Sequence, residues 1–249
     1  MAGYIEYYDN AHRYDELRFD SMVEVETTVA WMLAELEMND TAPILEVGAG
    51  TCRYGSELSR RLDCKFIGVD KSIAQLSRAP TGATTICGDA ANIPLRSSSC
   101  GVVLAVMMIH QLSLAQLASF LLEARRVLTN GGHLFIKTSS HEDLRNRPLV
   151  RYFPGTVNVN IDRYPQIAEV VDRLTRLAFR DIRIVPSITT EVVDSQILMG
   201  KVEGLGNTAL SLISDAEFRH GAALLRADLS GARSVELQHR HTYVVARAS

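Results

Sequence analysis

The sequence lacks both a long apolar run and an excess of charge of either sign. A membrane-spanning helix needs about 20 consecutive apolar residues, and no run in these 249 residues approaches that length. The net charge is −3, and the 26 Lys and Arg residues are scattered. The phosphates of a nucleic acid are bound by clustered basic residues. We therefore expect neither a membrane nor a nucleic acid among the partners.

Cysteines and targeting features are also scarce. The four cysteines, at positions 52, 64, 87 and 100, show no close pairing, which predicts free thiols in a reducing compartment. His239 and His241 would share one face of a strand, but no third ligand is apparent, so we expect no metal site. The amino terminus has no basic segment followed by an apolar stretch, and a secretory signal is not predicted. These features favour a cytoplasmic protein.

The chain contains enough apolar residues, 47% of the total, for one large α/β core. Its central stretch is 43–53, where a short apolar run at 44–47 predicts a buried strand. Gly48-Ala49-Gly50 follows, and a helix is expected from about Tyr54. Two glycines let the backbone pass close under a ligand, and the first N–H groups of a helix point at it. The pattern predicts a strand, turn and helix that bind a ligand.

Two acids follow later apolar runs. Asp70 ends the run 65–70, about twenty residues after the glycines, where a carboxylate can accept hydrogen bonds from ribose hydroxyls. Asp89 lies in Gly88-Asp89-Ala90, after an expected strand at 83–87. Its carboxylate could accept from an adenine amino group while the following N–H meets a ring nitrogen. The alternative is that Asp89 only caps a helix or turn.

These motifs together resemble one family. The matching residues are Glu46-Val-Gly-Ala-Gly50, Val69-Asp70-Lys71-Ser72, Gly88-Asp89-Ala90, the run Val102 to His110, and Leu128-Thr-Asn-Gly-Gly-His-Leu134. In order and spacing, over about residues 40 to 140, they are similar to the class I S-adenosylmethionine-dependent methyltransferases. The resemblance implies a Rossmann-like α/β fold with a seven-stranded, mostly parallel sheet and an antiparallel last strand. It also implies S-adenosyl-L-methionine as cofactor and transfer of its methyl group to a small-molecule substrate.

The resemblance also implies which residues bind the cofactor. They are Tyr14, Arg18, Glu46, Gly48, Ala49, Gly50, Asp70, Lys71, Asp89, Ala90 and Met107. Glu46 would support the methionine end indirectly, or only brace the turn. The family usually has glycine where this chain has Cys52, which we expect to add a side chain beside the cofactor. Cys100-Gly101 stands where most relatives begin a strand with Phe-Asp.

Two histidines are candidates for catalysis. His110 follows the apolar run 102–107, at the switch point of an open α/β sheet, where ligands bind. Its ordinary pKa suits proton removal near neutral pH, although many relatives use this histidine for packing or for the cofactor's carboxylate. His141, after the fifth strand, is the second candidate base. Holding the acceptor in line with the sulfonium methyl would supply much of the rate.

The two ends of the chain carry open alternatives. Residues 3–20 are rich in Tyr, Asp and Arg and predict either a segment that folds over the ligand or a helix packed on the domain. After position 138, Arg145, Arg147 and Arg151 alternate with aromatics and could hold an anionic or aromatic substrate, or form a solvated loop. Strands are expected at 181–185 and 242–246, with helices at 192–202 and 215–225 between them. That connection predicts a helical cap over the active site or a homodimer interface.

We therefore expect a single methyltransferase domain over 1–249. It would comprise a helical lid (1–40), a cofactor-binding core (41–138) and a substrate-side half (139–249) with a helical insertion at about 187–238. One rival is a regulatory protein that binds the same cofactor without methylating anything. Another is an NAD-dependent oxidoreductase, which fits the glycine turn and Asp70, although Gly88-Asp89-Ala90 is better explained by adenine in the methyltransferase orientation.

Overall fold

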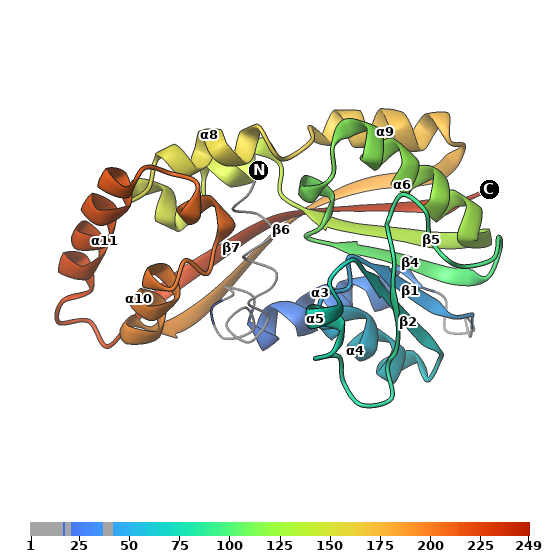
Figure 1. The fold of residues 1–249 in the computed structure, drawn as a ribbon, viewed down its shortest axis with the longest axis horizontal. Helices are drawn as coiled ribbons and strands as arrows, with labels where there is room; N and C mark the ends of the chain where they lie inside the picture. Colours follow the sequence, from blue (N-terminus) through green and yellow to red (C-terminus); the bar gives the residue numbers. More distant parts are fainter. Residues whose placement is uncertain (1–16, 18–20, 37–41) are drawn as a thin grey trace.

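A seven-stranded sheet organises the described part of the chain in the computed structural model (Figure 1). The structure describes residue 17 and residues 21–36 and 42–249. Tyr14 and Arg18, implied for cofactor binding, lie outside the described residues. The strands are β1 Ile44–Val47, β2 Phe66–Asp70, β3 Thr84–Cys87, β4 Cys100–Val106, β5 Leu128–Thr138, β6 Phe179–Asp194 and β7 Ser234–Ala248.

The strand order is β3-β2-β1-β4-β5-β7-β6. Parallel pairing joins β1 to β2 and β4, β2 to β3, and β4 to β5. The last strand, β7, inserts antiparallel between β5 and β6. This is the predicted Rossmann-like sheet. Its order reverses between β1 and β4, so the ligand site is expected beyond their carboxyl ends.

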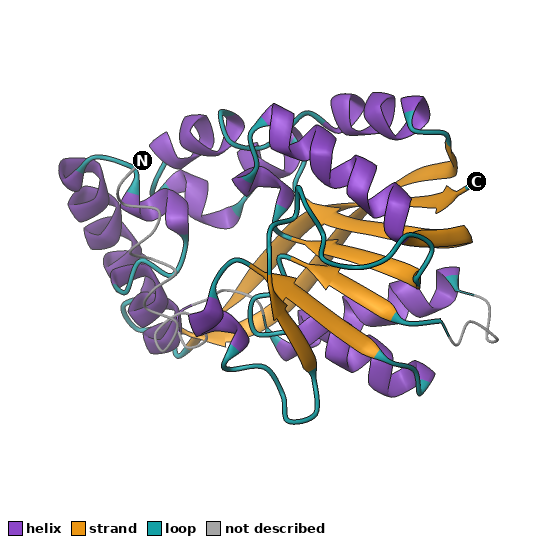
Figure 2. Cartoon of the chain, turned by 45° about the vertical axis from the view of Figure 1, so that its right-hand side comes forward, coloured by secondary structure: helices purple, strands orange, loops and turns teal. Residues whose placement is uncertain are grey.

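Helices cover both faces of the sheet because its central strands are apolar on both sides (Figure 2). All seven residues of β4 are buried. Val102 and Leu104 pack in one core with α3 Met22–Glu35, α4 Arg53–Leu62 and α5 Ile73–Leu76. Val103 and Ala105 pack in the other core with α6 Leu114–Val127 and α9 Ile167–Arg176. Within the described residues, no helix has the length and apolarity of a membrane span.

Strands β6 and β7 are much longer than predicted. Their antiparallel pairing continues from Phe179↔Ala248 to Asp194↔Ser234, whereas the sequence predicted only 181–185 and 242–246. The distal part of β6 alternates between exposed and half-buried positions, so it lacks the apolar run that marked the central strands. Residues 188–193 are nevertheless rich in β-branched side chains, which favour strands.

The long β6–β7 ribbon carries its own group of helices beyond the main sheet, at the left of Figure 1. The connection contains α10 Ser195–Glu203, η3 Thr208–Ser211 and α11 Asp215–Leu229. It packs with the segment after β5, which contains α7 His141–Arg145, η2 Pro148–Arg151 and α8 Gly155–Ile161. The insertion predicted at about 187–238 is therefore helical only in its middle, since 187–194 and 234–238 belong to the ribbon.

Candidate functional site

The glycine turn lies directly beyond the carboxyl end of β1. Gly48 and Gly50 have φ values of +66° and +52°, in the left-handed region that favours glycine. A Cβ on Gly48 would lie 2.7 Å from the Cβ of Met108. The turn therefore needs glycine at position 48 for both conformation and space. Helix α4 follows from Arg53, with Cys52 as its N-cap.

Asp70, at the carboxyl end of β2, is fixed against this turn by two backbone bonds. Its Oδ2 accepts from the Gly50 N–H at 2.8 Å, and its Oδ1 accepts from the Ser72 N–H, also at 2.8 Å. Each carboxylate oxygen has a second lone pair. The structure thus joins the glycines and the acid, and this carboxylate retains acceptor capacity for ligand hydroxyls.

Asp89 lies beyond the end of β3, beside Lys71. Its Oδ1 accepts from the Ala91 N–H at 2.9 Å, and its Oδ2 lies 3.0 Å from the Lys71 Nζ. The backbone bond from Ala91 and, next to it, the Lys71 ammonium hold the pKa of Asp89 below its usual value. Both side chains are about half exposed, and Ala90 is buried. The turn-capping role is visible here, and the adenine-reading role stays a prediction.

Glu46 is buried inside β1 and braces the start of α4. Its Oε2 accepts from the Gly55 N–H at 2.9 Å. A Cβ on Gly55 would come within 2.8 Å of the same oxygen, so this glycine allows the close approach. The bond satisfies one of the N–H groups that lack a partner at a helix start. This matches the bracing interpretation of Glu46.

Cys52 has a left-handed conformation, with φ of 62° and ψ of 29°. This conformation explains why the resembling family usually has glycine at this position. The expectation of a side chain beside the cofactor is wrong, because Cys52 is fully buried in the core with α3 and α4. Its Sγ occupies the space over Gly68, where a Cβ would approach it to 2.6 Å. Burial and the nearby Glu46 and Asp70 raise the pKa of this thiol to about 12.

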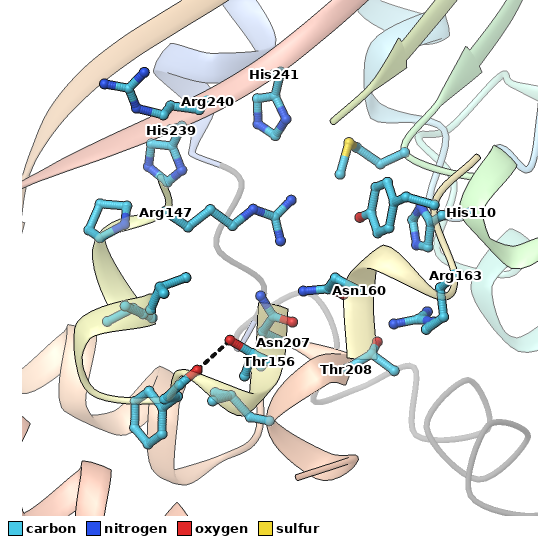
Figure 3. A pocket seen from close by; sticks show the side chains of 18 of the residues that line it. His110, Arg147, Thr156, Asn160, Arg163, Asn207, Thr208, His239, Arg240 and His241 are labelled. Carbon is cyan, nitrogen blue, oxygen red and sulfur yellow. Dashed lines mark hydrogen bonds between the residues drawn. The ribbon is translucent and has the colours of Figure 1, made fainter. Parts of the chain in front are cut away.

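A cavity of about 180 Å³ opens beyond the carboxyl ends of β4 and β5, between the sheet and the helices of the β6–β7 ribbon (Figure 3). Its basic side chains are His110, Arg147, Arg163, His239, Arg240 and His241. Its polar side chains include Thr156, Asn160, Asn207 and Thr208, and its apolar ones Met107, Leu149, Phe153, Leu210 and Leu237. None of the described residues that line it is Asp or Glu.

His110 reaches the cavity from the short helix η1 Ile109–Gln111, immediately after β4. Its ring stacks on Tyr164, with centroids 4.3 Å apart and planes 7° apart. Burial, with Arg163 and Arg147 close by, lowers the pKa of His110 well below its usual value. The imidazole is therefore neutral at neutral pH and has a nitrogen that can accept a proton. Its Nδ1 has no hydrogen-bond partner among the described residues.

Met107 makes the turn that delivers His110. Its φ of 49° is left-handed, and its N–H donates to the Lys137 carbonyl at 2.8 Å. A non-glycine residue held in this conformation costs about 1–3 kcal/mol and is often found at functional sites. Met107 also lines the cavity, whereas Met108 packs inward against Gly48.

His141 is not among the cavity-lining residues. It begins α7, and its Nε2 lies 2.9 Å from the Tyr164 carbonyl oxygen. Tyr164 in turn stacks on His110. The structure therefore places His141 behind Tyr164, where it can orient the tyrosine that supports the His110 ring.

The three arginines predicted together separate in the structure, and only Arg147 lines the cavity. Its Nη2 donates to the Ser139 Oγ at 2.9 Å, and its Cζ lies 5.9 Å from the centre of the Tyr164 ring. Arg145 is exposed. Arg151 pairs with Asp228 and stacks over the Tyr152 ring at 4.6 Å.

A buried ion pair that sequence reasoning missed lies next to the cavity. Lys137, in β5, and Glu24, in α3, are 0% and 1% exposed, and Nζ lies 2.6 Å from Oε1. The Thr28 hydroxyl and the Tyr54 hydroxyl lie 3.2 Å and 3.3 Å from the same Nζ. Burial raises the pKa of Glu24, but Lys137 and His241 outweigh it and hold this pKa below its usual range. The signal in the sequence was a lysine ending an apolar central strand.

The ion pair is connected to the cavity through His241. The His241 Nε2 contacts Glu24, and its Nδ1 lies 3.5 Å from the Ser139 Oγ, which also accepts from Arg147. Burial and Lys137 lower the pKa of His241, and the contact with Glu24 opposes this shift. His239 is bound instead to Glu191, with Nε2 2.7 Å from Oε1. Among the described residues, no three His, Cys, Asp or Glu side chains are arranged to hold a metal ion.

Comparisons with known proteins place this geometry in a family. Residues 45–136 match the model of a methyltransferase domain. A malonyl-[acyl-carrier protein] O-methyltransferase of Marinomonas sp. (strain MWYL1) is 31% identical over 140 residues, which cover 52% of this chain and 51% of that protein. The chain thus spans about half the length of this curated relative.

Solved structures show the same fold over most of the chain. A putative methyltransferase from an antibiotic biosynthesis pathway of Anabaena variabilis has a TM-score of 0.71 at 19% identity, covering 88% of this chain and 96% of that one. A Haemonchus contortus phosphoethanolamine N-methyltransferase, solved with S-adenosyl-L-methionine, has a TM-score of 0.55 at 16% identity, covering 89% and 52%. The match over residues 45–136, the sheet order and the glycine turn with its acid identify a methyltransferase domain of the class I, S-adenosylmethionine-dependent, Rossmann-like type.

Proposed function

We propose that this chain transfers a methyl group from S-adenosyl-L-methionine to a small-molecule acceptor bound in the cavity beyond β4. One observation carries the proposal. The turn, with Asp70 fixed to Gly50 at 2.8 Å, contacts the segment after β4, because Gly48 packs against Met108, and the neighbouring Met107 and His110 line the cavity. A cofactor held by the turn would therefore lie beside the segment that forms one wall of the cavity.

The residues present fit this cofactor. Positions 48 and 50 of the turn carry no side chain, and the Cys52 side chain is buried in the core. Asp70 would accept from the ribose hydroxyls, and Asp89 with the Ala90 N–H would read the adenine. When bound, S-adenosyl-L-methionine supplies a methyl group activated by its sulfonium centre. Glu46 and Lys71 would act indirectly, one by bracing α4 and the other by pairing with Asp89.

The chain's own contribution is to hold the acceptor in position. A bound nucleophile aligned with the methyl group reacts as if present at very high concentration, which can supply much of the rate. His110 would accept the proton of a hydroxyl or amine acceptor, because its lowered pKa leaves a neutral ring at the cavity wall. His141 would contribute by holding Tyr164 against that ring.

The domain organisation is part of the same proposal. We take 1–249 as a single methyltransferase domain with a core at 41–138, a lid at 1–40 and a substrate-side half at 139–249. The contact of Glu24 with Lys137 ties α3, within the lid segment, to the cavity side of the sheet. The helices carried by the β6–β7 ribbon would form the cap, because Asn207, Thr208 and Leu210 line the cavity.

Calorimetric titration with S-adenosylmethionine, S-adenosylhomocysteine and NAD tests the proposal. We expect micromolar binding of the two adenosyl ligands and none of NAD. Asp70→Ala should weaken adenosyl binding at least about 30-fold, since hydrogen bonds to a charged group contribute about 1.5–3 kcal/mol each. Asp172→Ala, which removes an acid exposed on α9, is the matched control and should bind normally.

Three outcomes decide between the interpretations. Preference for NAD, or no adenosyl binding by the wild type, would refute the methyltransferase assignment. Adenosyl binding without methyl transfer to any acceptor in a broad screen would favour a regulatory binding protein instead. Binding that survives Asp70→Ala unchanged would show that the ligand does not use the glycine turn.

A further inference from the structure

We propose that the cavity recognises an oxyanion, a carboxylate or a phosphate group, on its acceptor, with Arg147 as the principal ligand for that group. The inference rests on the proposed function in one respect, since it takes the cavity to be the acceptor site. It goes further by naming the substrate class, for which the geometry of three cavity residues, Arg147, Arg240 and Asn160, supplies the argument.

Among the described residues that line the cavity, the charged side chains are all basic. Three arginines line it, and its described lining residues include no acid. Arg147 and Arg240 have no carboxylate within ion-pair distance among the described residues; Arg147 contacts Ser139, and Arg240 contacts Gln238 at 3.4 Å. Two other half-buried arginines are paired with acids, Arg126 with Glu123 and Arg173 with Glu169, whereas Arg247 contacts the Gly131 carbonyl.

Desolvated guanidinium groups are costly unless an opposite charge balances them. Arg147 and Arg240 are half-buried, and the Arg240 Nε is buried without a hydrogen-bond partner in the described part of the chain. An oxyanion in the cavity would provide the missing negative charge and acceptor atoms. A cationic acceptor would add repulsion, so the wall selects against it.

Arg147 is oriented for this task. The Ser139 Oγ accepts from one of its Nη atoms at 2.9 Å, and its guanidinium lies over the Tyr164 ring. A guanidinium has five N–H donors, so a fork of donors remains for a carboxylate or phosphate, which it can bind in bidentate fashion. Figure 3 shows Arg147 extending across the cavity towards Asn160. Asn160 is 4% exposed, and its amide can donate to the same group.

The other residues that line the cavity indicate what the acceptor carries besides its anionic group. Phe153, Leu210 and Leu237 are buried together in the cap core and give the cavity an apolar floor for a hydrocarbon or aromatic part. His110 and Met107 line the cavity just after the end of β4, where the methyl group would arrive. The acceptor thus has an anionic group near Arg147 and a reacting atom near His110.

Anion binding would also change the proton affinity of His110. The positive charges of Arg163 and Arg147 contribute to its lowered pKa. An oxyanion bound by Arg147 would offset the field of that guanidinium, so the imidazole would become a stronger base when the acceptor is bound. The histidine would then be most basic in the complex that needs it, and this shift can be measured without turnover.

The test uses four probes with the same six-carbon chain: hexanoate, hexyl phosphate, 1-hexanol and hexylamine. Each is titrated at fixed ionic strength into the full chain saturated with S-adenosylhomocysteine, and followed by NMR. We expect at least one of the two anions to bind ten-fold or more tightly than hexanol, and hexylamine to bind more weakly than hexanol. The comparison of hexanoate with hexyl phosphate shows which oxyanion the site takes.

Variants locate the site. Arg147→Gln should reduce anion affinity at least ten-fold, and Arg147→Lys, which keeps the charge but not the fork, should be intermediate. Arg219→Gln is the matched control, because Arg219 is exposed on α11 and outside the cavity. The ring protons of His110 should show a higher titration midpoint with the bound anion than without it. A melting curve on each variant establishes that it is folded, and if Arg147→Gln is not, Arg147→Lys decides.

The inference fails if hexanol binds as tightly as both anions, or if Arg147→Gln and Arg219→Gln have equal effects. Its failure is separable from that of the proposed function. Binding of S-adenosylhomocysteine without anion selectivity would leave the methyltransferase proposal standing and overturn the oxyanion site. Arg147-dependent anion binding in a protein that does not bind S-adenosylhomocysteine would do the reverse.

Discussion

The two halves of the candidate site are built in different ways. At the cofactor edge, which is the glycine turn with Asp70, the contacts come from the backbone: the Gly50 and Ser72 N–H groups both donate to the Asp70 carboxylate. The cavity is instead lined by side chains from η1, the segment after β5, and the β6–β7 ribbon. The edge is made of neighbouring strand ends, and the cavity of segments far apart in the sequence.

The difference has an energetic counterpart. The acids at the edge are satisfied by backbone N–H groups, which the fold holds in place regardless of neighbouring side chains. The region beside the cavity relies on Lys137 and Glu24, whose charges are stable in the interior only as a pair. Substitutions should therefore be far more damaging beside the cavity than at the rim of the edge.

Lys137→Met should produce the largest effect. Methionine fills most of the same space but leaves the Glu24 carboxylate buried without its cation, which costs about 3–5 kcal/mol of the free energy of unfolding. Urea denaturation at pH 7 measures the loss. Lys65→Met, at an exposed lysine, is the control and should change little.

Adding Glu24→Gln to Lys137→Met should recover part of that stability, because a neutral amide is cheaper to bury than an unpaired charge. The two substitutions are therefore not additive. A double variant no more stable than Lys137→Met would contradict the account of a mutually dependent pair. So would a loss below about 1 kcal/mol in the single variant, well under the cost of an unpaired buried charge.

Gly68→Ala, beneath the cofactor edge, should have an intermediate effect. The new Cβ would lie 2.6 Å from the Cys52 Sγ and 3.2 Å from the Ala49 Cβ, and overpacking of this kind costs about 1–3 kcal/mol. Combining it with Cys52→Gly should restore stability, since glycine removes the clash and accepts the left-handed conformation. Thermal melts of the two single variants and the double variant give the coupling. Strict additivity would mean that positions 52 and 68 do not share this space.

Lys71→Gln, at the exposed rim, should have the smallest effect, below about 0.5 kcal/mol at pH 7. The pKa of Asp89 should remain below its usual value of 3.8, because the Ala91 N–H is the larger cause. A lowered carboxyl pKa contributes stability above pH 3.8 that is lost as the pH falls through the folded-state value. The variant and wild type should show nearly parallel acid profiles, with the Asp89 carboxyl followed by NMR. An Asp89 pKa at its ordinary value in Lys71→Gln would assign the shift to the ion pair instead.

The glycine turn and the acids after β2 and β3 could be located from the sequence, because each belongs to a short, local pattern of residues. The apolar run at 44–47 predicted β1, and the resemblance implied a seven-stranded, mostly parallel sheet with an antiparallel last strand; the structure agrees with both. Sequence reasoning missed the length of β6 and β7, whose distal residues are half exposed and follow no apolar run. Their pairing depends on contacts between positions 40 or more apart, such as Asp194↔Ser234 at its far end and Arg183↔Val245 near the sheet.

The cavity could be predicted only in outline. The sequence offered Arg145, Arg147 and Arg151 as equals, and only the path through α7 and η2 decides that Arg147 faces inward. The Glu24–Lys137 pair joins residues 113 positions apart, so spacing gives no hint of it. At Cys52 the sequence did show the departure from the glycine motif. It did not show that Gly68, which has no side chain, leaves the space that the Cys52 Sγ occupies.

The burial of Cys52 also affects the reactivity of its thiol towards the sulfonium cofactor that we propose for the neighbouring turn. A sulfonium compound alkylates thiolates, and this cysteine is two residues from the turn proposed to hold one. With its pKa raised to about 12, the thiol remains protonated at neutral pH, and its Sγ is enclosed over Gly68. Packing thus denies this thiol both the negative charge and the access that methylation by a neighbouring sulfonium compound would require.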